Sequence, residues 1–438
     1  MKNLKLSIPS DSITSEVFFA LQLRIANELF LPKLKTFQCE DLTDEFIPFI
    51  PLFLSSQTSE ITIEFGDESH PIADASIITR LPTLCPKLER ITLNLNYRDP
   101  VITEAVSEML LACNRDSLKV FSVDCPLTEE AQEVVCQLPK LSKLSMVIQG
   151  QTRLPPVSLP NLTYIDLEYD DHLDWLQGFR GMALKKLESV HFHSESGKIG
   201  DFLGEFESVA LTTSIKNTLS TFEFYASCTS DPNYSSLLSF KQLKILEIGF
   251  SCYDGCSSTV DDQVIITLAQ AMPKLETLRL GGAPCGTSTG ATIDGLIGPA
   301  SRCPRLSALR VHFQAYNLID AATNATTVPS LNGEREVQRE GCALTDLEVG
   351  DTPISPQSAS TLVLILLHIF PHIRNVKYNN REWETVAETV KRFRQIGTFV
   401  HHRGEGRRYV QLSLQMTRYQ ESGIDIKPRQ EKVRRRRQ

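Results

Sequence analysis

Acidic side chains crowd one segment of this 438-residue chain. Asp166 and Glu168 alternate along an expected strand, and His172 and three further aspartates follow within the next six residues. Clustered carboxylates are the ligands that hard cations such as Ca²⁺ prefer. The spacing is not that of a calcium-binding loop, so the charged end of a solvated strand is the favoured interpretation.

Two further patterns have the residue types of a zinc site. His191 and His193 flank Phe192 and share one face of an expected strand, and Cys252 and Cys256 form a close thiol pair. Zinc needs three or four protein ligands at matching positions, and neither pattern has an adjacent third ligand. The sequence therefore predicts no metal site and no cofactor.

Several motifs of nucleotide-binding and hydrolytic enzymes are missing from the chain. It has no G-x-x-x-x-G-K-[ST] loop, H-E-x-x-H helix or C-x-x-C pair. The glycine-rich stretch 280–290 lacks the lysine that reaches a phosphate, so it is expected to be a strand-to-helix loop. We predict that the protein has no catalytic residues and is not an enzyme.

A recurring phrase determines where the chemically interesting side chains lie. CPKLERITLNL at Cys85 returns as LPKLSKLSM at Leu138, MPKLETLRL at Met272 and CPRLSALRV at Cys303. Each copy has apolar residues at positions 1, 4 and 6 of a short window, the L-x-x-L-x-L core of a leucine-rich repeat. A strand in this frame points positions 1, 4 and 6 into the core and positions 3, 5 and 7 to the concave surface.

The frame recurs about every 28 residues, a period that leaves room for one strand and one helix in each unit. The anchors are Met1-Leu4-Leu6, Leu34-Phe37-Cys39, the weak copy Thr58-Ile61-Ile63, Leu88-Ile91-Leu93, Leu118-Phe121-Val123, Leu141-Leu144-Met146, Leu162-Ile165-Leu167, Leu187-Val190-Phe192, Leu219-Phe222-Phe224, Leu243-Leu246-Ile248, Leu275-Leu278-Leu280, Leu306-Leu309-Val311, Leu344-Leu347-Val349 and Ile373-Val376-Tyr378. We therefore predict an α/β fold: a leucine-rich-repeat solenoid, or horseshoe, with a parallel concave sheet and helices on the convex side.

Segments between the anchors have the features of helices. Residues 259–272 begin with Thr259, whose hydroxyl can cap free N–H groups, and end before a proline. The segments 128–138 and 103–113 also begin with threonine. The most apolar run, 361–370, is half the roughly 20 residues that cross a bilayer. It is expected to be a buried repeat helix, and no membrane association is predicted.

Three regions are expected along the chain. Residues 1–380 carry the repeats, with a loop insertion at 317–341. Residues 381–420 are expected to cover the last repeat, because a solenoid needs its open end closed. This cap is predicted to be an amphipathic helix that contains Trp383, followed by a hairpin whose first arm includes Phe399 and Val400. Residues 421–438 form a basic tail that is expected to be disordered.

The tail concentrates positive charge. Residues 427–437 hold seven positive side chains and one negative, and subtracting this +6 from the net charge of −8 leaves −14 for the rest of the chain. A nuclear localisation signal or polyanion-binding patch and a solvated chain end are both compatible with this composition. An acidic body without aromatic residues among the arginines disfavours nucleic acid as a partner.

The 11 cysteines occur at positions typical of small apolar residues. Cys39 is a core anchor, and Cys85 and Cys303 precede the prolines of the repeat phrase. Reduced, buried thiols explain this distribution better than disulfides do. No charged leader with an apolar run and a cleavage site occurs at the N-terminus. We expect a cytoplasmic or nuclear location.

Positions 3, 5 and 7 predict a concave face with an acidic, aromatic centre and a basic border. The candidate partner-binding residues are Asp124, Tyr164, Asp166, Glu168, His191, His193, Glu223, Tyr225, Glu247, Arg279, Arg310 and His312. Complementary charge steers protein partners, and tyrosine supplies buried contact area. The simpler alternative is that these charges only solvate the strands. We predict a protein partner on the concave face, because solenoid concavities often bind partners.

The phrases at Cys85 and Cys303 resemble the leucine-rich repeats of the ribonuclease-inhibitor-like superfamily. They are most similar to those of the large fungal group of F-box/leucine-rich-repeat-like proteins. The resemblance implies a substrate receptor, in which an F-box docks on the Skp-type adaptor of a cullin ubiquitin ligase and the repeats hold the substrate. This chain contains no L-P-x-E-I-L-type helix before the repeats, so the Skp-type adaptor is expected as a partner only if an F-box precedes this chain.

Two other functions remain open. The repeats could serve a structural or regulatory scaffold without ubiquitin chemistry, including a regulator of small GTPases. An enzyme is the least favoured class.

Overall fold

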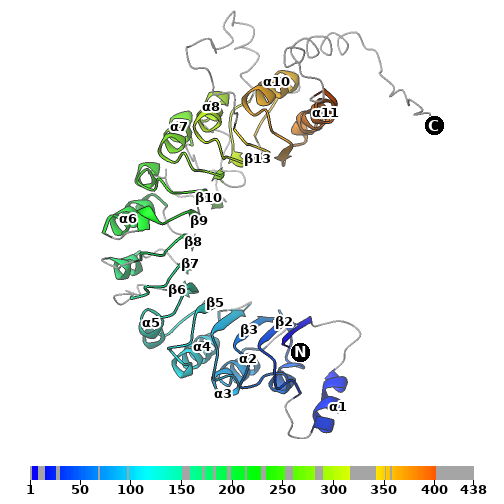
Figure 1. Cartoon of the computed structure of the whole chain (residues 1–438), viewed down its shortest axis with the longest axis vertical. Coiled ribbons are helices and arrows are strands. Elements are labelled where there is room, and N and C mark those ends of the chain that lie inside the picture. Colours follow the sequence, from blue (N-terminus) through cyan, green and yellow to red (C-terminus); the bar gives the residue numbers. More distant parts are fainter. Residues whose placement is uncertain are drawn as a thin grey trace, which may run out of the picture.

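Strands and helices alternate along the computed structural model, and the strands stack side by side into one curved parallel sheet (Figure 1). Within the described residues this sheet has 14 strands, paired in the order of the sequence. The predicted α/β fold with a leucine-rich-repeat-like solenoid arrangement is thereby confirmed. The structure describes residues 2–400 except 8–14, 26–29, 68–69, 96–97, 150–157, 170–172, 181–183, 195–198, 213–214, 228–232, 252–259, 282–289, 316–341, 351 and 356–357.

Each predicted anchor frame corresponds to one strand. The strands are β1 Asn3–Ser7, β2 Thr36–Leu42, β3 Glu60–Phe65, β4 Arg90–Asn94, β5 Val120–Pro126, β6 Lys143–Ile148, β7 Tyr164–Tyr169, β8 Ser189–Ser194, β9 Thr221–Ser227, β10 Ile245–Ser251, β11 Thr277–Leu280, β12 Ala308–Val311, β13 Asp346–Gly350 and β14 Asn375–Tyr378. Equivalent positions of consecutive repeats lie side by side, as Ile91 does with Ile61 and Phe121.

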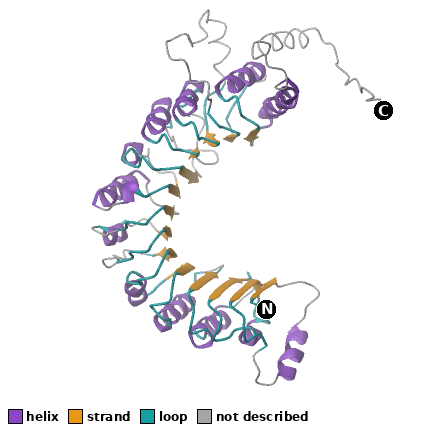
Figure 2. Ribbon diagram, in the orientation of Figure 1, coloured by secondary structure: helices purple, strands orange, loops and turns teal. Residues whose placement is uncertain are grey.

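Helices lie along the outer side of the curve and strands along its inner side (Figure 2). The described α-helices are α1 Ser15–Ile25, α2 Pro71–Ile78, α3 Leu81–Leu84, α4 Pro100–Ala112, α5 Glu129–Val135, α6 Ile199–Thr212, α7 Asp262–Ala271, α8 Ile293–Arg302, α10 Ala359–Ile369 and α11 Glu384–Val400. The described 3-10 helices are η1 Ile47–Leu52, η2 Asp174–Phe179, η3 Ile215–Asn217, η4 Tyr234–Leu237 and η6 Arg381–Trp383. None of the described helices combines the length and the apolarity of a bilayer span.

The core consists of the anchor side chains between the sheet and the outer layer. Leu93, Leu167 and Ile248 are fully buried, as positions 4 and 6 of the frame require. Asn94, the residue after Leu93, is exposed on the opposite face of the same strand. Burial of one such aliphatic side chain stabilises the fold by about 1.5–3 kcal/mol. The repeated phrase therefore specifies core packing, and the side chains at its alternate positions face away from the core.

One anchor is polar and is nevertheless fully buried. Thr58 occupies the position that leucine has in most of the other repeats, and it is fully buried. Its hydroxyl donates to the carbonyl oxygen of Leu34 at 3.2 Å and accepts from the backbone N–H of Ser55 at 3.2 Å. Because a buried hydroxyl with both partners carries little penalty, this weak copy of the frame still forms a regular repeat.

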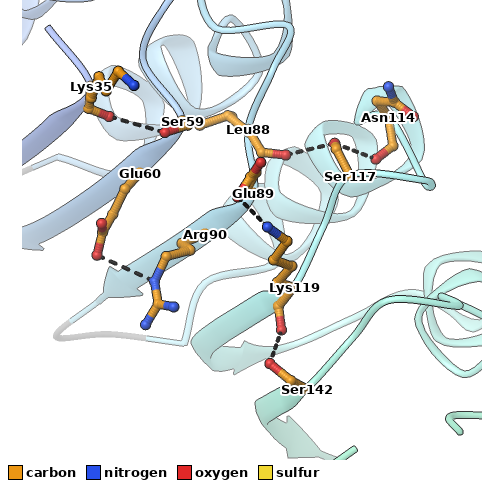
Figure 3. A network of polar contacts seen from close by, with 10 residues as sticks. All are labelled: Lys35, Ser59, Glu60, Leu88, Glu89, Arg90, Asn114, Ser117, Lys119 and Ser142. Atoms are coloured by element: carbon orange, nitrogen blue, oxygen red, sulfur yellow. Dashed lines mark hydrogen bonds and ion pairs between the residues drawn. The ribbon is translucent and has the colours of Figure 1, made fainter. Parts of the chain in front are cut away.

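Neighbouring repeats are also joined where their strands begin (Figure 3). The carbonyl oxygen of Lys35 accepts from the backbone N–H groups of Ser59 and Glu60 at 2.9 and 3.0 Å, and the Ser59 hydroxyl adds a bond at 3.5 Å. The Ser142 hydroxyl donates in the same way to Lys119 at 2.9 Å. Equivalent hydroxyl bonds come from Thr163, Ser220, Ser307 and Thr345. Each contributes about 1 kcal/mol, and together they hold adjacent repeats in register.

The helix starts differ in detail from those predicted. Thr128 caps α5 as expected and accepts from the backbone N–H of Ala131 at 3.4 Å. The helix predicted to begin at Thr103 starts earlier, because Asp99 is its cap and a proline takes the first position. The cap of α7 is Asp261, which accepts from Val264 at 2.8 Å. The prediction of Thr259 as the cap was therefore wrong. Thr259 itself lies outside the described residues.

Helix α11 packs against the last strand of the sheet and carries the predicted apolar face. Val386 and Val390 are buried there. Trp383, in the turn before α11, is fully buried, and its indole N–H donates to the carbonyl oxygen of Thr352 at 2.8 Å. Because α11 continues through Val400, residues 399–400 end a helix, and their prediction as a hairpin arm was wrong. Residues 317–341, 409–414 and the basic tail lie outside the described residues.

An aromatic cluster packs behind β7, β8 and β9. Phe202 of α6 is its centre, with ring centroids 4.6 Å from Phe224, 4.9 Å from Phe192 and 5.7 Å from Tyr169. Aromatic pairs at these separations add stabilisation beyond the area that they bury. This cluster supports the three strands from behind and fixes the positions of their concave side chains.

We expect Phe202→Ala to lower the free energy of unfolding by about 3–5 kcal/mol, since it leaves a cavity among rigid rings. Leu211→Ala is the matched control, because Leu211 is on the same helix and 57% exposed. The control should change stability by less than about 0.5 kcal/mol. Chemical denaturation of both variants checks this expectation, and equal losses would contradict it.

Candidate functional site

The predicted binding residues all lie at the outward positions of the concave sheet. In β7, Ile165 and Leu167 are buried. The residues that alternate with them, Tyr164, Asp166 and Glu168, are half-buried. The other predicted residues are Asp124 on β5, His191 and His193 on β8, Glu223 and Tyr225 on β9, Glu247 on β10, Arg279 on β11, Arg310 on β12 and His312 just after β12. We call Tyr164, Asp166, Glu168, His191, His193, Glu223 and Tyr225 the central cluster.

His191 connects the strands on either side of it. Strand register places it between Asp166 of β7 and Glu223 of β9. Its Nδ1 is 3.0 Å from a Glu223 carboxylate oxygen, and its Nε2 is 2.8 Å from the Ser189 hydroxyl. The hydrogen bond from His191 holds the pKa of the Glu223 carboxyl below its ordinary value. The Tyr164 ring lies 4.8 Å from the imidazole and completes its surroundings.

His193 makes an equivalent bridge one step further along the strand. Its Nε2 is 3.8 Å from an Asp166 oxygen, and its ring stacks on Tyr225 at 5.1 Å with an interplanar angle of 8°. The Tyr225 ring in turn occupies the space that a side chain at Gly249 would fill. Partial burial, followed by a hydrogen bond with Glu247, raises the pKa of Tyr225 above its ordinary value.

Tyr164 is held from two sides. The ammonium of Lys143 lies 4.4 Å from its ring centroid, a cation–π contact. Its hydroxyl is 3.5 Å from an Asp166 oxygen, and that oxygen also accepts from Ser145 at 3.2 Å. Burial, and then the negative charge of Asp166, raise the pKa of Tyr164 to about 12. The phenol therefore stays protonated and acts as a hydrogen-bond donor.

The basic border begins with a nearly buried ion pair. Arg279 binds Glu247 at 2.9 Å, and the Glu247 side chain is only 8% exposed. Arg310, beside Arg279 in the sheet, pairs with Glu348 of the following strand at 3.4 Å. The His312 ring packs against the backbone of Gly350, which has a φ of 55°. Arg310 and His312 thus contact the next repeat, whereas Glu247 and Arg279 extend the central cluster.

Asp124 joins the site through a loop that follows β4. Both of its carboxylate oxygens accept from the backbone N–H of Leu95, at 2.7 and 2.8 Å. Arg98 of the same loop forms an ion pair with Glu168, 70 residues later in the chain. The Arg98 side chain therefore borders the central cluster.

Sequence reasoning missed several residues of this surface. Lys143, Ser145, Ser189 and Glu348 occupy positions 3 or 5 of their strands, so the repeat frame itself was a sufficient signal for them. Arg98 lies in a loop outside the frame, and its spacing from Glu168 has no repeat meaning. Its role depends on the curvature of the sheet and on the loop path, which no local pattern specifies.

Ser189, His191 and Glu223 contact one another in the order of a hydrolytic Ser–His–acid triad. Acyl transfer also needs N–H donors directed at the developing oxyanion. Two amides of these strands donate elsewhere: the N–H of Ser189 to Thr163 at 3.0 Å and that of Thr221 to Glu188 at 3.0 Å. The contacts with Ser189 and Glu223 fix the orientation of the His191 ring.

Metal ligation was not predicted, and the described residues contain no group of three or more His, Cys, Asp or Glu side chains that could hold a metal ion. The aspartates that follow β7, His172 and the pair Cys252 and Cys256 fall largely outside those residues. The seven described cysteines are buried and free. Burial raises the pKa of the Cys39 and Cys303 thiols to about 12, which keeps them protonated and unreactive.

The fold and this surface define a repeat solenoid whose inner wall is polar and cross-linked by hydrogen bonds and ion pairs. No model of a known protein family matches the chain, and none of the curated proteins is significantly similar to it. Membership of the fungal F-box/leucine-rich-repeat-like group therefore stays a prediction.

Asp124 makes stability depend on pH. Partial burial, only partly offset by the Leu95 hydrogen bond, raises its pKa from 3.8 to about 6. A raised pKa favours the protonated carboxyl in the folded state, so its stabilisation is complete below pH 3.8 and is lost as the pH rises through 6. Because more than a third of Asp124 stays exposed, solvent screens part of this effect.

We expect Asp124→Asn, which keeps an acceptor for Leu95 without the charge, to raise the Tm relative to the unchanged protein at pH 7.5. At pH 4 the two proteins should differ less. Thermal unfolding at both values measures this. A variant that is less stable at pH 7.5 and equally so at pH 4 would contradict the assigned pKa.

Proposed function

We propose that this protein is a protein-binding leucine-rich-repeat module that captures a partner on its concave face. Its partner-binding residues are those predicted from the outward strand positions, with the central cluster as the main contact and Arg279, Arg310 and His312 as the basic border. The supporting observation is that the polar side chains of β7 to β11 are held in fixed geometry by contacts with one another.

This fixed geometry favours recognition. A surface whose side chains are already ordered loses less conformational entropy when a partner binds. The aromatic cluster around Phe202 supports the same strands from behind and limits their movement. Charges that only solvate a strand do not need such contacts across three or four neighbouring strands.

Within this function, the resemblance favours a substrate-receptor-like adaptor in the cytoplasm or nucleus that presents its partner for cullin-type ubiquitin ligation. The alternative is a ubiquitin-independent scaffold or a regulator of small GTPases. Both are binding functions on the same face, so they differ in what else the protein assembles with.

Simultaneous Asp166→Lys, Glu168→Lys and Glu223→Lys substitutions should abolish partner capture, because they reverse the charge at the centre of the face. The circular dichroism spectrum should stay unchanged. Partners are identified by cross-linked affinity capture and then measured as purified proteins. Glu104→Lys, Glu108→Lys and Glu133→Lys form the control, since these exposed side chains lie on α4 and α5 of the outer layer. Undiminished affinity of the concave variant would remove the proposal.

Association with a ubiquitin ligase separates the two versions of the function. If the protein is a substrate receptor, a Skp-type adaptor and a cullin should co-purify with it from cells that express the natural gene product. The concave charge-reversal variant should keep these two proteins and lose the captured partner. Capture of the partner without adaptor or cullin would favour the scaffold or GTPase-regulator alternative.

A further inference from the structure

The carboxylates at the centre of the concave face differ in their counter-ions. Glu168 is paired with Arg98, and Glu247 is paired with Arg279. Asp166 and Glu223 form their direct ion pairs, within the described residues, with histidines. Within the part of the chain that the structure describes, these two carboxylates therefore lack the direct Lys or Arg partner that Glu168 and Glu247 have.

The shape of the surface follows the same division. His191 lies between Asp166 and Glu223 in the sheet, and its side chain is 16% exposed, against 30% for Asp166 and 24% for Glu223. The imidazole thus lies between two carboxylates that are more exposed than it is. Two strand spacings separate those carboxylates at the backbone, about 9–10 Å, so one cationic head group can approach both.

The protein itself shows which groups this surface accepts. Lys143 rests on the Tyr164 ring, Arg98 reaches Glu168 from a loop, and Arg279 binds Glu247. In each case a long cationic side chain lies on a carboxylate or an aromatic ring of the concave face. The surface over His191, which we call the cation seat, has the same kinds of side chain. Tyr164 contacts the imidazole, and Asp166 and Glu223 lie on either side of it.

We propose that the partner presents a lysine or arginine side chain, carried on an extended segment, which binds over His191 between Asp166 and Glu223. This inference rests on the proposed function and names the chemistry of the partner at that surface. The cation supplies the direct Lys or Arg partner that Asp166 and Glu223 lack among the described residues. Its aliphatic stem packs on Tyr164. An acidic segment is excluded from the same place by the two carboxylates.

The test uses fluorescein-labelled deca-lysine and deca-glutamate, with fluorescence anisotropy at 50 mM salt and the full chain. Asp166→Asn together with Glu223→Gln removes both charges and keeps the shapes. We expect this variant to bind deca-lysine about tenfold more weakly than the unchanged protein does. Glu104→Gln with Glu108→Gln on α4 is the matched control for non-specific binding to exposed acids, and should change the affinity less than about twofold.

Two outcomes of the peptide-binding test would overturn the proposed cation seat. These are equal losses in the concave and α4 variants, or tighter binding of deca-glutamate than of deca-lysine. The proposed function is judged separately, by the purified partner. If the charge-reversal variant loses the partner while Asp166→Asn with Glu223→Gln binds it unchanged, the concave face still binds the partner but the cation seat does not exist.

Discussion

The in-register pairing of neighbouring parallel strands is the constraint on which this structure depends. It places the anchor positions of one repeat beside those of the next, as Ile165 lies beside Val190, and Asp166 lies beside His191 in the same way. Among the described strands, the register shifts only at the ends of β2–β3, β5–β6 and β13–β14. The buried positions of successive strands therefore form one core, and the outward positions form rows across the sheet. Packing and surface positions thus alternate within a single strand.

Most of the fold could be predicted, because the apolar frame repeats and each copy supports the same interpretation. Even the polar anchor Thr58 was found, since its neighbours Ile61 and Ile63 kept the period. Helix starts were less predictable. Thr103 is a good cap in isolation, but Asp99 followed by a proline offers a stronger one four residues earlier. Such local competition is decided by how the preceding strand ends, which periodicity does not describe.

The concave site was predictable in its membership but not in its pairings. The frame places Asp166, His191 and Glu223 outward, and this could be deduced from the sequence alone. Which atoms meet depends on side-chain rotamers and on loops such as the one that brings Arg98 to Glu168. Consequently, the sequence indicated an acidic centre, whereas the structure shows how its carboxylates are paired. Glu168 and Glu247 contact arginines, and Asp166 and Glu223 contact histidines.

Gly249 has a consequence for how this surface can diverge. The Tyr225 ring lies where a β-carbon at position 249 would be, and this placement brings it against His193 and Glu247. A larger residue at 249 would displace the ring and disturb contacts on two strands at once. Substitutions at the two positions are therefore epistatic: a side chain at 249 becomes acceptable only after the aromatic ring at 225 has been lost. The missing side chain at 249, as much as the tyrosine, therefore maintains the contacts of Tyr225 on the concave face.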